Sequence, residues 1–335
     1  MAAAGRHHVV VIGASAGGVP ALRQVVGDLP DDFPACVLVV LHVNPDAPSL
    51  LPAILGRETR LETRHAVDGD RLDSPRILVA PPDFQTTVDD GRRLRVERGP
   101  RQNNMRPAID PLMRSAAREL GPDAVGVILT GMLHDGTAGL AAIKSAGGAT
   151  VVQDPGTAEY PSMPRHAVEG VRPDHVVPLE AIPALLERLT ATPLEEVESI
   201  VTARVPAHPP IEVGDDNTGQ LTAFTCPECH GTIWELDEAG VPTFRCRVGH
   251  RYGIESLVAS QSAGTEASLW AAARALEEKA SLNRRVAVRL NRSGHGASAL
   301  RFERIAEEAE VQAAQVKLLL EQVETPPAPS PASAA

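Results

Sequence analysis

The chain has 335 residues, the length of two ordinary domains or of one domain with additions. Hydrophobic residues make up 43% and charged residues 22%, which is typical of a folded globular protein and not of a disordered or fibrous one. The 43 acidic residues outnumber the 32 Lys and Arg residues, and the resulting net charge of -11 argues against nucleic-acid binding through a broadly basic surface. The sequence contains neither an apolar run of membrane-spanning length nor a signal-peptide pattern at its start, so we expect a cytoplasmic protein.

Short apolar runs alternate with helical patterns from residue 8 to about residue 191. The runs are rich in β-branched residues and bounded by Gly or Pro, as buried parallel strands are; they are Val9–Ile12, Val37–Leu41, Ile77–Val79, Val125–Leu129 and Thr150–Val152. Helical spacing of apolar residues lies between them, in 19–26, 49–55, 109–120 and 138–146. Turn residues between 85–88 and 94–96 predict an antiparallel hairpin. Residues 1–192 are therefore predicted to form a doubly wound, mainly parallel α/β domain with one hairpin.

The second half of the chain divides into four further segments. Residues 193–222 are rich in Pro, Glu and Thr, which predicts a linker. Residues 223–255 hold four of the nine aromatic residues, so a small core of their own is expected; these are Phe224, Trp234, Phe244 and Tyr252. Two apolar stripes in 256–324 predict a helical hairpin, the first running through Ala273 and Ala280 and the second through Ala309 and Leu319. Residues 325–335 are predicted to be a disordered tail. Because such stripes favour packing or dimerisation, a homo-oligomer through these helices is a further expectation.

Three polar side chains follow three of the predicted strands. Gly13-Ala14-Ser15-Ala16-Gly17-Gly18 comes directly after the first strand, and its serine is either a nucleophile or part of an anion-cradling loop. His42 follows the second strand and Asp135 a later one; alone, the histidine suits a structural role and the aspartate a helix N-cap. Carboxyl ends of parallel strands meet at one sheet edge, so the three can assemble as nucleophile, base and orienting acid.

Several separated motifs in this order resemble the catalytic domain of the chemotaxis protein-glutamate methylesterases. They are the Ser15 turn, the strand-end His42, Arg106-Pro-Ala-Ile-Asp110, Thr130-Gly-Met-Leu-His-Asp135-Gly136 and the stretch from Gln153-Asp154 to Met163-Pro164. The resemblance covers about residues 8 to 190 and implies that Ser15 is the nucleophile, His42 the general base and Asp135 the residue that orients the base. The chain starts at the first strand, so we expect a stand-alone form without the receiver domain that commonly precedes this domain in the family.

The resemblance implies hydrolysis of methyl esters on glutamate side chains of a chemoreceptor, with release of methanol, and deamidation of receptor glutamines as a second activity. Such catalysis needs no cofactor. Backbone N–H groups of Met132 and Ala16 are the candidates for an oxyanion hole. The expected partner is the cytoplasmic domain of a methylated chemoreceptor or a related sensory receptor. Two alternatives stay open: a catalytically idle signalling scaffold, which would have no need of all three residues together, and a small-molecule esterase.

Three of the four cysteines gather in one short segment. Cys226, Cys229, Cys246 and His250 follow the spacing C-x2-C-x16-C-x3-H, which can close a tetrahedral Zn²⁺ site with three thiolates and one imidazole. His230 directly follows Cys229 and is the weaker ligand candidate. Four protein ligands leave no open position, so a structural zinc in a ribbon-like module at 223–255 is predicted, with a docking role favoured over nucleic-acid binding.

Overall fold

The structure of the protein, a computed structural model, describes residues 8–43, 45, 48–191 and 219–323. Most of the predicted linker and the whole of the predicted tail lie outside these residues. The described part up to Leu257 belongs to one compact unit, and the part from Val258 belongs to a second. Among the described helices, none is both long and apolar enough to cross a membrane.

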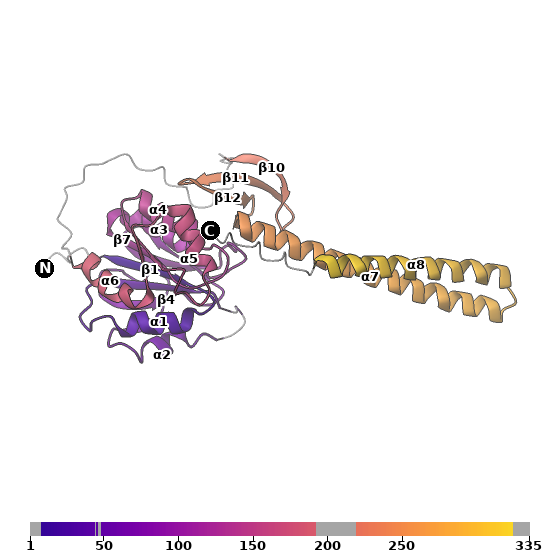
Figure 1. The fold of residues 1–335 in the computed structure, drawn as a ribbon, viewed down its shortest axis with the longest axis horizontal. Helices are drawn as coiled ribbons and strands as arrows, with labels where there is room; N and C mark the ends of the chain where they lie inside the picture. Colours follow the sequence, from indigo (N-terminus) through magenta and orange to yellow (C-terminus); the bar gives the residue numbers. More distant parts are fainter. Residues whose placement is uncertain (1–7, 44, 46–47, 192–218, 324–335) are drawn as a thin grey trace, which may run out of the picture. The chain divides into compact units, whose positions relative to one another are not determined.

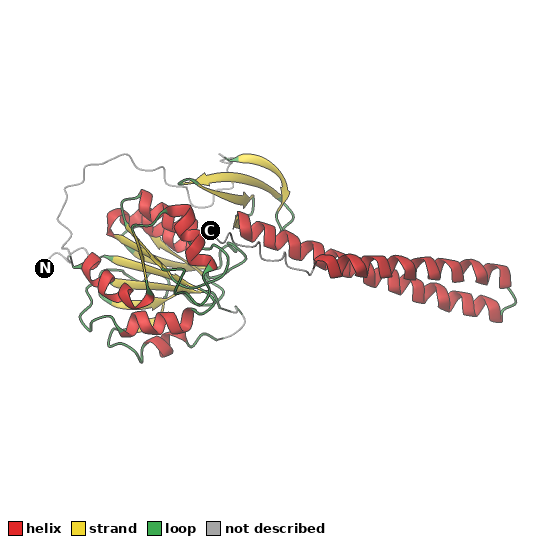
Figure 2. Ribbon diagram, viewed as in Figure 1, coloured by secondary structure: helices red, strands yellow, loops and turns green. Residues whose placement is uncertain are grey.

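A seven-stranded parallel sheet forms the centre of the first unit (Figure 1; Figure 2). Its strand order is β3-β4-β2-β1-β7-β8-β9. The strands are β1 Val9–Ala14, β2 Cys36–Leu41, β3 Thr63–His65, β4 Arg76–Val79, β7 Ala124–Ile128, β8 Ala149–Gln153 and β9 His175–Val177. The chain order reverses at β1, which pairs with β2 on one side and β7 on the other. Open parallel sheets hold their ligands at the carboxyl edge of such a switch point.

Helices cover both faces of this sheet (Figure 1). One face carries α1 (Gly18–Gly27), α2 (Leu51–Leu55) and α6 (Ile182–Thr190), and the other carries α3 (Ile109–Leu120), α4 (Thr137–Ser145) and α5 (Ser162–Val171). Short 3-10 turns at Gly121–Asp123 and Leu179–Ala181 precede β7 and α6. Side chains alternate along β1. Val9 and Val11 pack on the face covered by α3, α4 and α5, and Val10 and Ile12 pack on the face covered by α1, α2 and α6.

The predicted fold class is confirmed, and so is the antiparallel hairpin, which is β5 (Gln85–Asp89) paired with β6 (Arg93–Glu97). The edge strands β3 and β9 and the helices α5 and α6 were not predicted. Each edge strand has only three residues, and none of these is fully buried. A continuous apolar run is the sequence signal of a strand buried on both faces, so short edge strands lack it.

Residues 220–253, called the ribbon below, form a four-stranded antiparallel sheet in the order β10-β11-β12-β13. The strands are β10 Gln220–Thr225, β11 Thr232–Glu238, β12 Val241–Cys246 and β13 Arg251–Gly253. A small core exists there, as expected, but the aromatic residues contribute unequally. Phe244 and Tyr252 are buried, whereas Phe224 is 48% exposed and meets Phe244 only edge-on. Cys226, Cys246, Ile233 and Leu257 fill the remaining core positions, so cysteine side chains replace part of the expected aromatic packing.

The second unit is a hairpin of two long helices, α7 (Ile254–Arg292), whose first residues lie in the first unit, and α8 (Gly296–Val323). The break between them agrees with the sequence prediction. The helices pack against each other within the chain, and the ion pairs Arg284–Glu310 and Lys317–Glu277 show that they run antiparallel. Buried positions along the seam are almost all alanine: Ala273, Ala280, Ala287, Ala299, Ala306, Ala309, Ala313 and Leu320. Leu319, placed on the predicted stripe, is 50% exposed, so the seam lies one residue away from it.

Candidate active site

Ser15 occupies a tight turn between β1 and α1. Its backbone N–H donates to the Thr130 carbonyl (3.0 Å), and its own carbonyl accepts from Gly18 N (2.9 Å). Gly17 caps α1 with a left-handed φ of 71°, a conformation that costs glycine little. A Cβ on Gly131 would lie 2.9 Å from the Ser15 Cβ, so the loop after β7 passes this turn at a distance that only glycine allows. The serine is thereby held next to two neighbouring strand ends.

A continuous chain of hydrogen bonds links Ser15, His42 and Asp135. The Ser15 hydroxyl donates to His42 Nδ1 at 3.1 Å, and His42 Nε2 donates to Asp135 Oδ2 at 2.7 Å. The imidazole and carboxylate side chains are only 6% and 3% exposed. With the proton on Nε2, the Nδ1 lone pair faces the hydroxyl and can accept its proton. The three residues predicted from the strand ends are therefore brought together in the geometry of a serine nucleophile with its base.

Asp135 is surrounded by four donors. Oδ2 also accepts from Ile109 N (2.7 Å), while Oδ1 accepts from the Asn103 Nδ2 (2.9 Å) and Asp110 N (3.3 Å). Asp135 thus caps α3, not its own helix α4. Asp110 does the converse, accepting from Gly136 N (3.1 Å) and Gly139 N (2.7 Å) at the start of α4. This exchange of caps fixes the orientation of the carboxylate that faces His42.

The two buried carboxylates have opposite protonation behaviour. Burial disfavours the charge on Asp135, but the hydrogen bonds from His42, Ile109 and Asn103 outweigh it and hold the pKa of Asp135 below its usual range. Burial, together with the neighbouring Asp135 charge, raises the pKa of Asp110 to about 6. Asp135 therefore stays ionised beside His42 at neutral pH, and a carboxylate in this place can stabilise an imidazolium.

Two backbone N–H groups on the loops around Ser15 are the candidates for an oxyanion hole. Among the described residues, neither Ala16 N nor Met132 N has a hydrogen-bond acceptor. The Thr130 hydroxyl joins their loops by donating to the Ala16 carbonyl (3.1 Å) and accepting from Tyr160 N (2.8 Å). Both N–H groups are thus available to an oxygen bound next to Ser15.

Comparison with known proteins identifies the family. Residues 10–186 match the family model described as CheB methylesterase. The chain belongs to the CheB methylesterase family. The match spans the parallel sheet and its helices, so the family and fold predicted from the sequence motifs are confirmed.

Related CheB proteins agree with the predicted activity. A "Protein-glutamate methylesterase/protein-glutamine glutaminase 2" of Anaeromyxobacter dehalogenans is 43% identical over 189 residues, which are 56% of this chain and 55% of that protein. A "Putative protein-glutamate methylesterase/protein-glutamine glutaminase" of Leptospira interrogans is 35% identical over 190 residues, 57% of this chain and 98% of that protein. The crystal structure of the Thermotoga maritima CheB methylesterase catalytic domain aligns with a TM-score of 0.53 at 33% identity and covers 55% of this chain and 99% of that one. The chain thus spans little more than half of the first relative and nearly all of the second.

The ribbon, outside the CheB match, gathers its cysteines and one histidine. The ligand atoms of Cys226, Cys229, Cys246 and His250 all lie within 4.8 Å of one another. Cys229 Sγ lies 3.6 Å from Cys246 Sγ, and Cys246 Sγ lies 3.6 Å from His250 Nδ1. Zn–S and Zn–N bonds of about 2.3 and 2.0 Å give tetrahedral edges of about 3.5–3.8 Å, so the cluster has the dimensions of a zinc site. His230 is exposed and outside the cluster, as the sequence predicted.

A carboxylate stands behind the histidine of this cluster. His250 Nε2 lies 3.2 Å from Glu228 Oε2, which fixes the ring so that Nδ1 faces the sulfurs. A carboxylate paired with the far nitrogen is the usual arrangement behind a metal-bound histidine. The donor set and its support therefore fit Zn²⁺.

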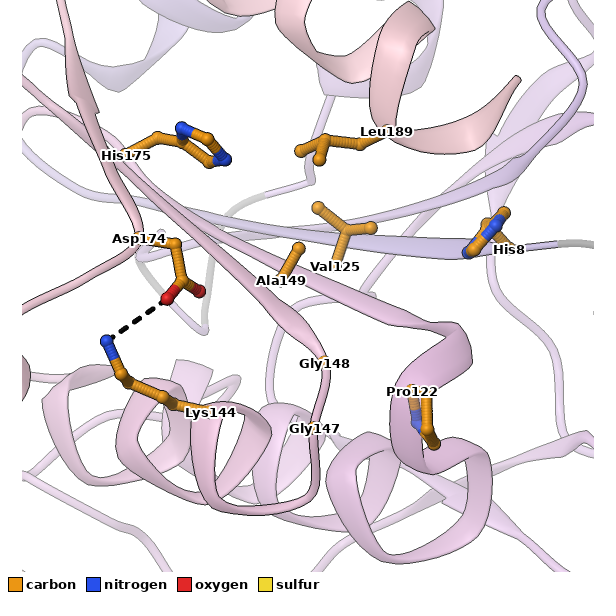
Figure 3. Close-up of a pocket in the computed structure, with 10 residues that line it drawn as sticks. All are labelled: His8, Pro122, Val125, Lys144, Gly147, Gly148, Ala149, Asp174, His175 and Leu189. Carbon is orange, nitrogen blue, oxygen red and sulfur yellow. Dashed lines mark hydrogen bonds and ion pairs between the residues drawn. The ribbon is translucent and has the colours of Figure 1, made fainter. Parts of the chain in front are cut away.

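A cavity of about 460 Å³ lies at the opposite edge of the CheB sheet (Figure 3). Its lining includes Ala149 and His175, the first residues of β8 and β9, and the ion pair between Lys144 Nζ and Asp174 Oδ1 at 3.1 Å. These positions are at the amino ends of the strands, whereas Ser15 lies at the carboxyl end of β1. The cavity is therefore separate from the candidate active site.

Two residues of the candidate active site, Asp110 and Asn103, were not predicted from the sequence. Asp110 was noted only as part of a motif, and Asn103 was not singled out. Asn103 lies in a loop without periodic pattern, and its partners Asp135 and Gly253 are far away in the sequence. The one local signal was Asn103-Asn104, a pair typical of left-handed turn conformations, and both residues have positive φ.

Proposed function

We propose that this protein is a serine hydrolase that removes methyl esters from glutamate side chains of a chemoreceptor and releases methanol. The observation that carries the proposal is the hydrogen-bonded chain from Ser15 through His42 to Asp135 at the switch point of the sheet. The names of the relatives support the substrate class. Deamidation of receptor glutamines, with release of ammonia, follows by the same attack on an amide carbonyl.

The reaction proceeds in two halves. Ser15 Oγ attacks the ester carbonyl while His42 Nδ1 takes the hydroxyl proton, and the imidazolium that forms is stabilised by Asp135. The Ala16 and Met132 N–H groups stabilise the oxyanion, each donor contributing about 10²–10³ in rate. The C–O bond to the methoxy group then breaks and His42 returns the proton, so methanol leaves. Water repeats the sequence on the acyl-enzyme and releases the glutamate carboxylate together with free Ser15.

The substrate lies in a receptor helix, and the surroundings of Ser15 support binding to a helix surface. Met132 and Tyr160 are 57% and 38% exposed next to the turn. They offer apolar contact to a helix beside the esterified glutamate. The proposed partner is therefore the cytoplasmic helical domain of a methylated receptor.

The deciding experiment measures methanol release from a receptor cytoplasmic fragment methylated by its methyltransferase. Wild type should release methanol, and Ser15→Ala should lose roughly 10⁶ in kcat, the cost of deleting the nucleophile in a serine hydrolase. The two proteins should have the same melting temperature, because the serine side chain fills no core position. Hydrolysis of small chromogenic esters without methanol release would favour a small-molecule esterase. Inactivity on both substrates would favour a scaffold.

We also propose that Cys226, Cys229, Cys246 and His250 bind a structural Zn²⁺. The cluster dimensions and the Glu228 carboxylate behind His250 support the assignment. Bound zinc would hold the two loops that carry the ligands, and with four protein ligands it would leave no position for substrate. Metal analysis of the full chain should find about one zinc per chain in wild type and none after Cys226→Ser. A cluster free of zinc in protein purified without chelator would refute the site.

The helical hairpin carries a separate proposal, that copies of this chain associate through it. Leu282, Leu300 and Leu318 are 63%, 67% and 58% exposed, although α7 and α8 already pack against each other. Light scattering of wild type and of a Leu282→Glu/Leu300→Glu variant checks this. A monomeric wild type at high concentration would exclude it.

A further inference from the structure

The loop between β6 and α3 connects the ribbon to the candidate active site. Asn103 N donates to the Arg251 carbonyl at 2.7 Å, and Arg251 N donates to the Arg101 carbonyl at 3.4 Å. Gln102 therefore pairs with Arg251 in the manner of a parallel strand. The loop thus forms a single parallel bridge with β13, and these backbone hydrogen bonds hold its conformation against the ribbon.

The side chain of Asn103 joins the two regions directly. Its Oδ1 accepts from Gly253 N in β13 at 2.9 Å, and its Nδ2 donates to Asp135 Oδ1 at 2.9 Å and to Asp110 Oδ2 at 3.1 Å. Only 4% of Asn103 is exposed, so water does not substitute for these partners. Both ends of the amide are used, one by the ribbon and the other by the carboxylates behind His42.

The contact around Gly253 is close and specific. A Cβ at this position would lie 1.7 Å from His134 Nε2, well inside the distance that two atoms can share. An ion pair from α3 lies nearby, in which Arg114 reaches Glu238 Oε2 at 2.8 Å, and Glu238 also pairs with Arg251. The ribbon thus contacts the sheet domain through a glycine backbone and a half-buried cluster of charged side chains.

We propose that Asn103 is a positioning residue for Asp135 and that the folded ribbon holds Asn103 in place, so that the state of the ribbon sets the reactivity of Ser15. The inference rests on the proposed function only in taking Ser15 as the nucleophile. Asn103 donates to Oδ1 and His42 to Oδ2, so the amide fixes the carboxylate plane against which the imidazole is oriented. Loss of the ribbon contact frees the amide, and Asp135 then loses one of its four donors.

The test uses full-length variants that remove the contact from either side. Asn103→Gly keeps the left-handed backbone (φ 51°) and deletes only the amide. Gly253→Ala separates β13 from His134 without touching a cysteine or the three active-site residues. The matched controls are Asn104→Gly, an exposed neighbour that also has positive φ, and Gly264→Ala, where a Cβ has nothing within 4 Å.

The first readout is the rate at which a fluorophosphonate labels the serine. The Ser15 Oγ–P bond forms, the P–F bond breaks with loss of fluoride, and His42 takes the hydroxyl proton, so no receptor is needed. A lost hydrogen bond to a charged group corresponds to about 10- to 100-fold, and we expect that decrease for Asn103→Gly and for Gly253→Ala. The double variant should be no slower than the slower single variant, because both remove one interaction. Both controls should label at the wild-type rate.

Two further readouts distinguish positioning from general damage. In methanol release, kcat should fall with the labelling rate while KM stays unchanged. The downfield proton resonance of His42 Nε2 should broaden or shift in both single variants and remain in the controls. Treatment of wild type with a zinc chelator should reproduce the Gly253→Ala labelling rate and leave Asn103→Gly unaffected.

Each outcome has a defined meaning. Wild-type labelling rates in Asn103→Gly would overturn the inference and leave the proposed function standing, and multiplicative effects in the double variant would also overturn it. No labelling of Ser15 in wild type would overturn the proposed function instead. If Gly253→Ala fails to fold, Glu238→Gln tests the ribbon side: it weakens the pairs to Arg114 and Arg251, and an unchanged labelling rate in it would contradict the inference.

Discussion

The parallel-sheet domain and the ribbon both hold polar side chains at fixed distances, but their cores differ greatly. The sheet domain has two extensive apolar clusters, one on each face, and its Ser15–His42–Asp135 chain lies at the edge of an already stable structure. Six buried residues form the ribbon's cluster, and two of them are the proposed zinc ligands Cys226 and Cys246. The sheet domain can therefore lose the side chains of its site and keep its fold. The ribbon depends for its folding on the side chains that form its site.

The largest expected difference between the two regions is their response to metal removal. A structural zinc contributes about 10–16 kcal/mol to the folding of a small module, so a strong chelator should unfold the ribbon and leave the sheet domain folded. Trp234 lies in β11 and reports on the ribbon through its fluorescence, once the second tryptophan is removed by Trp270→Phe. Circular dichroism should still show the cooperative melting of the sheet domain. Unchanged Trp234 fluorescence in metal-free protein would contradict this comparison.

The second effect concerns the polar chain of the sheet domain. In Asp135→Asn an amide must face four donors, and it cannot accept from all of them, so the base is wrongly oriented and kcat should fall by about 10⁴. Stability should fall as well. Because the pKa of Asp135 is lowered by folding, its contribution is present above pH 3.8 and is lost as the pH falls through the folded-state pKa.

A matched control for Asp135→Asn is available at the opposite edge of the sheet. Asp174 also accepts hydrogen bonds from a backbone N–H and a hydroxyl, both of Thr150. Asp174→Asn should leave methanol release at the wild-type level. Urea unfolding of Asp135→Asn with the same pH dependence as wild type below pH 3.8 would argue against the ionised state of this carboxylate.

A third effect compares the two cores directly. Leu38 is 1% exposed in the sheet and Ile233 is 0% exposed in the ribbon, and truncation of either to Ala should cost about 2–5 kcal/mol. In Leu38→Ala the cost should appear in the global unfolding of the sheet domain. In Ile233→Ala it should appear as faster transfer of zinc to a chelator, with the sheet transition unchanged. The control Leu282→Ala, at a 63% exposed position, should change neither measurement by more than about 0.5 kcal/mol.

The smallest effect tests the contact between the two regions. Burial lowers the pKa of His134, which faces Glu255, Asp135 and His166 and packs against Gly253. The unfolded state binds the proton more readily, so wild type should lose stability as the pH falls below 6.5. In His134→Gln this loss should be absent, and urea unfolding above and below pH 6.5 measures the difference. Equal pH dependence in both proteins would contradict this prediction, because it would show that His134 binds a proton as readily in the folded state as in the unfolded state.

The part of the site that the sequence predicted consists of residues with strong local signals. Ser15, His42 and Asp135 each follow a β-branched strand, and parallel topology alone brings strand ends together. The cysteine spacing is equally local. Asn103 could not be found in this way, because its role comes from a loop that meets Asp135 and Gly253 only after the whole unit has folded.

The contrast between strong and weak local signals also explains which strands could be predicted from the sequence. Central strands such as β1 and β2 are buried on both faces and read as continuous apolar runs, whereas β9 at the edge includes Val176, which is 43% exposed. For the helical hairpin, the sequence pattern predicted two helices, and Ala273, Ala280 and Ala309 of the predicted stripes do lie in the seam. The pattern also placed large side chains such as Leu319 there, whereas the remaining buried positions are almost all alanine.

Sequence change in this seam is restricted in an unusual way. Ala273, Ala280 and Ala287 recur every seven residues in α7, and a second series recurs every seven residues in α8 as Ala299, Ala306, Ala313 and Leu320. An insertion of another length in one helix would rotate every later alanine out of the seam and bring larger side chains into it. Viable length variants of the hairpin would therefore arise in paired steps of seven residues, one step in each helix.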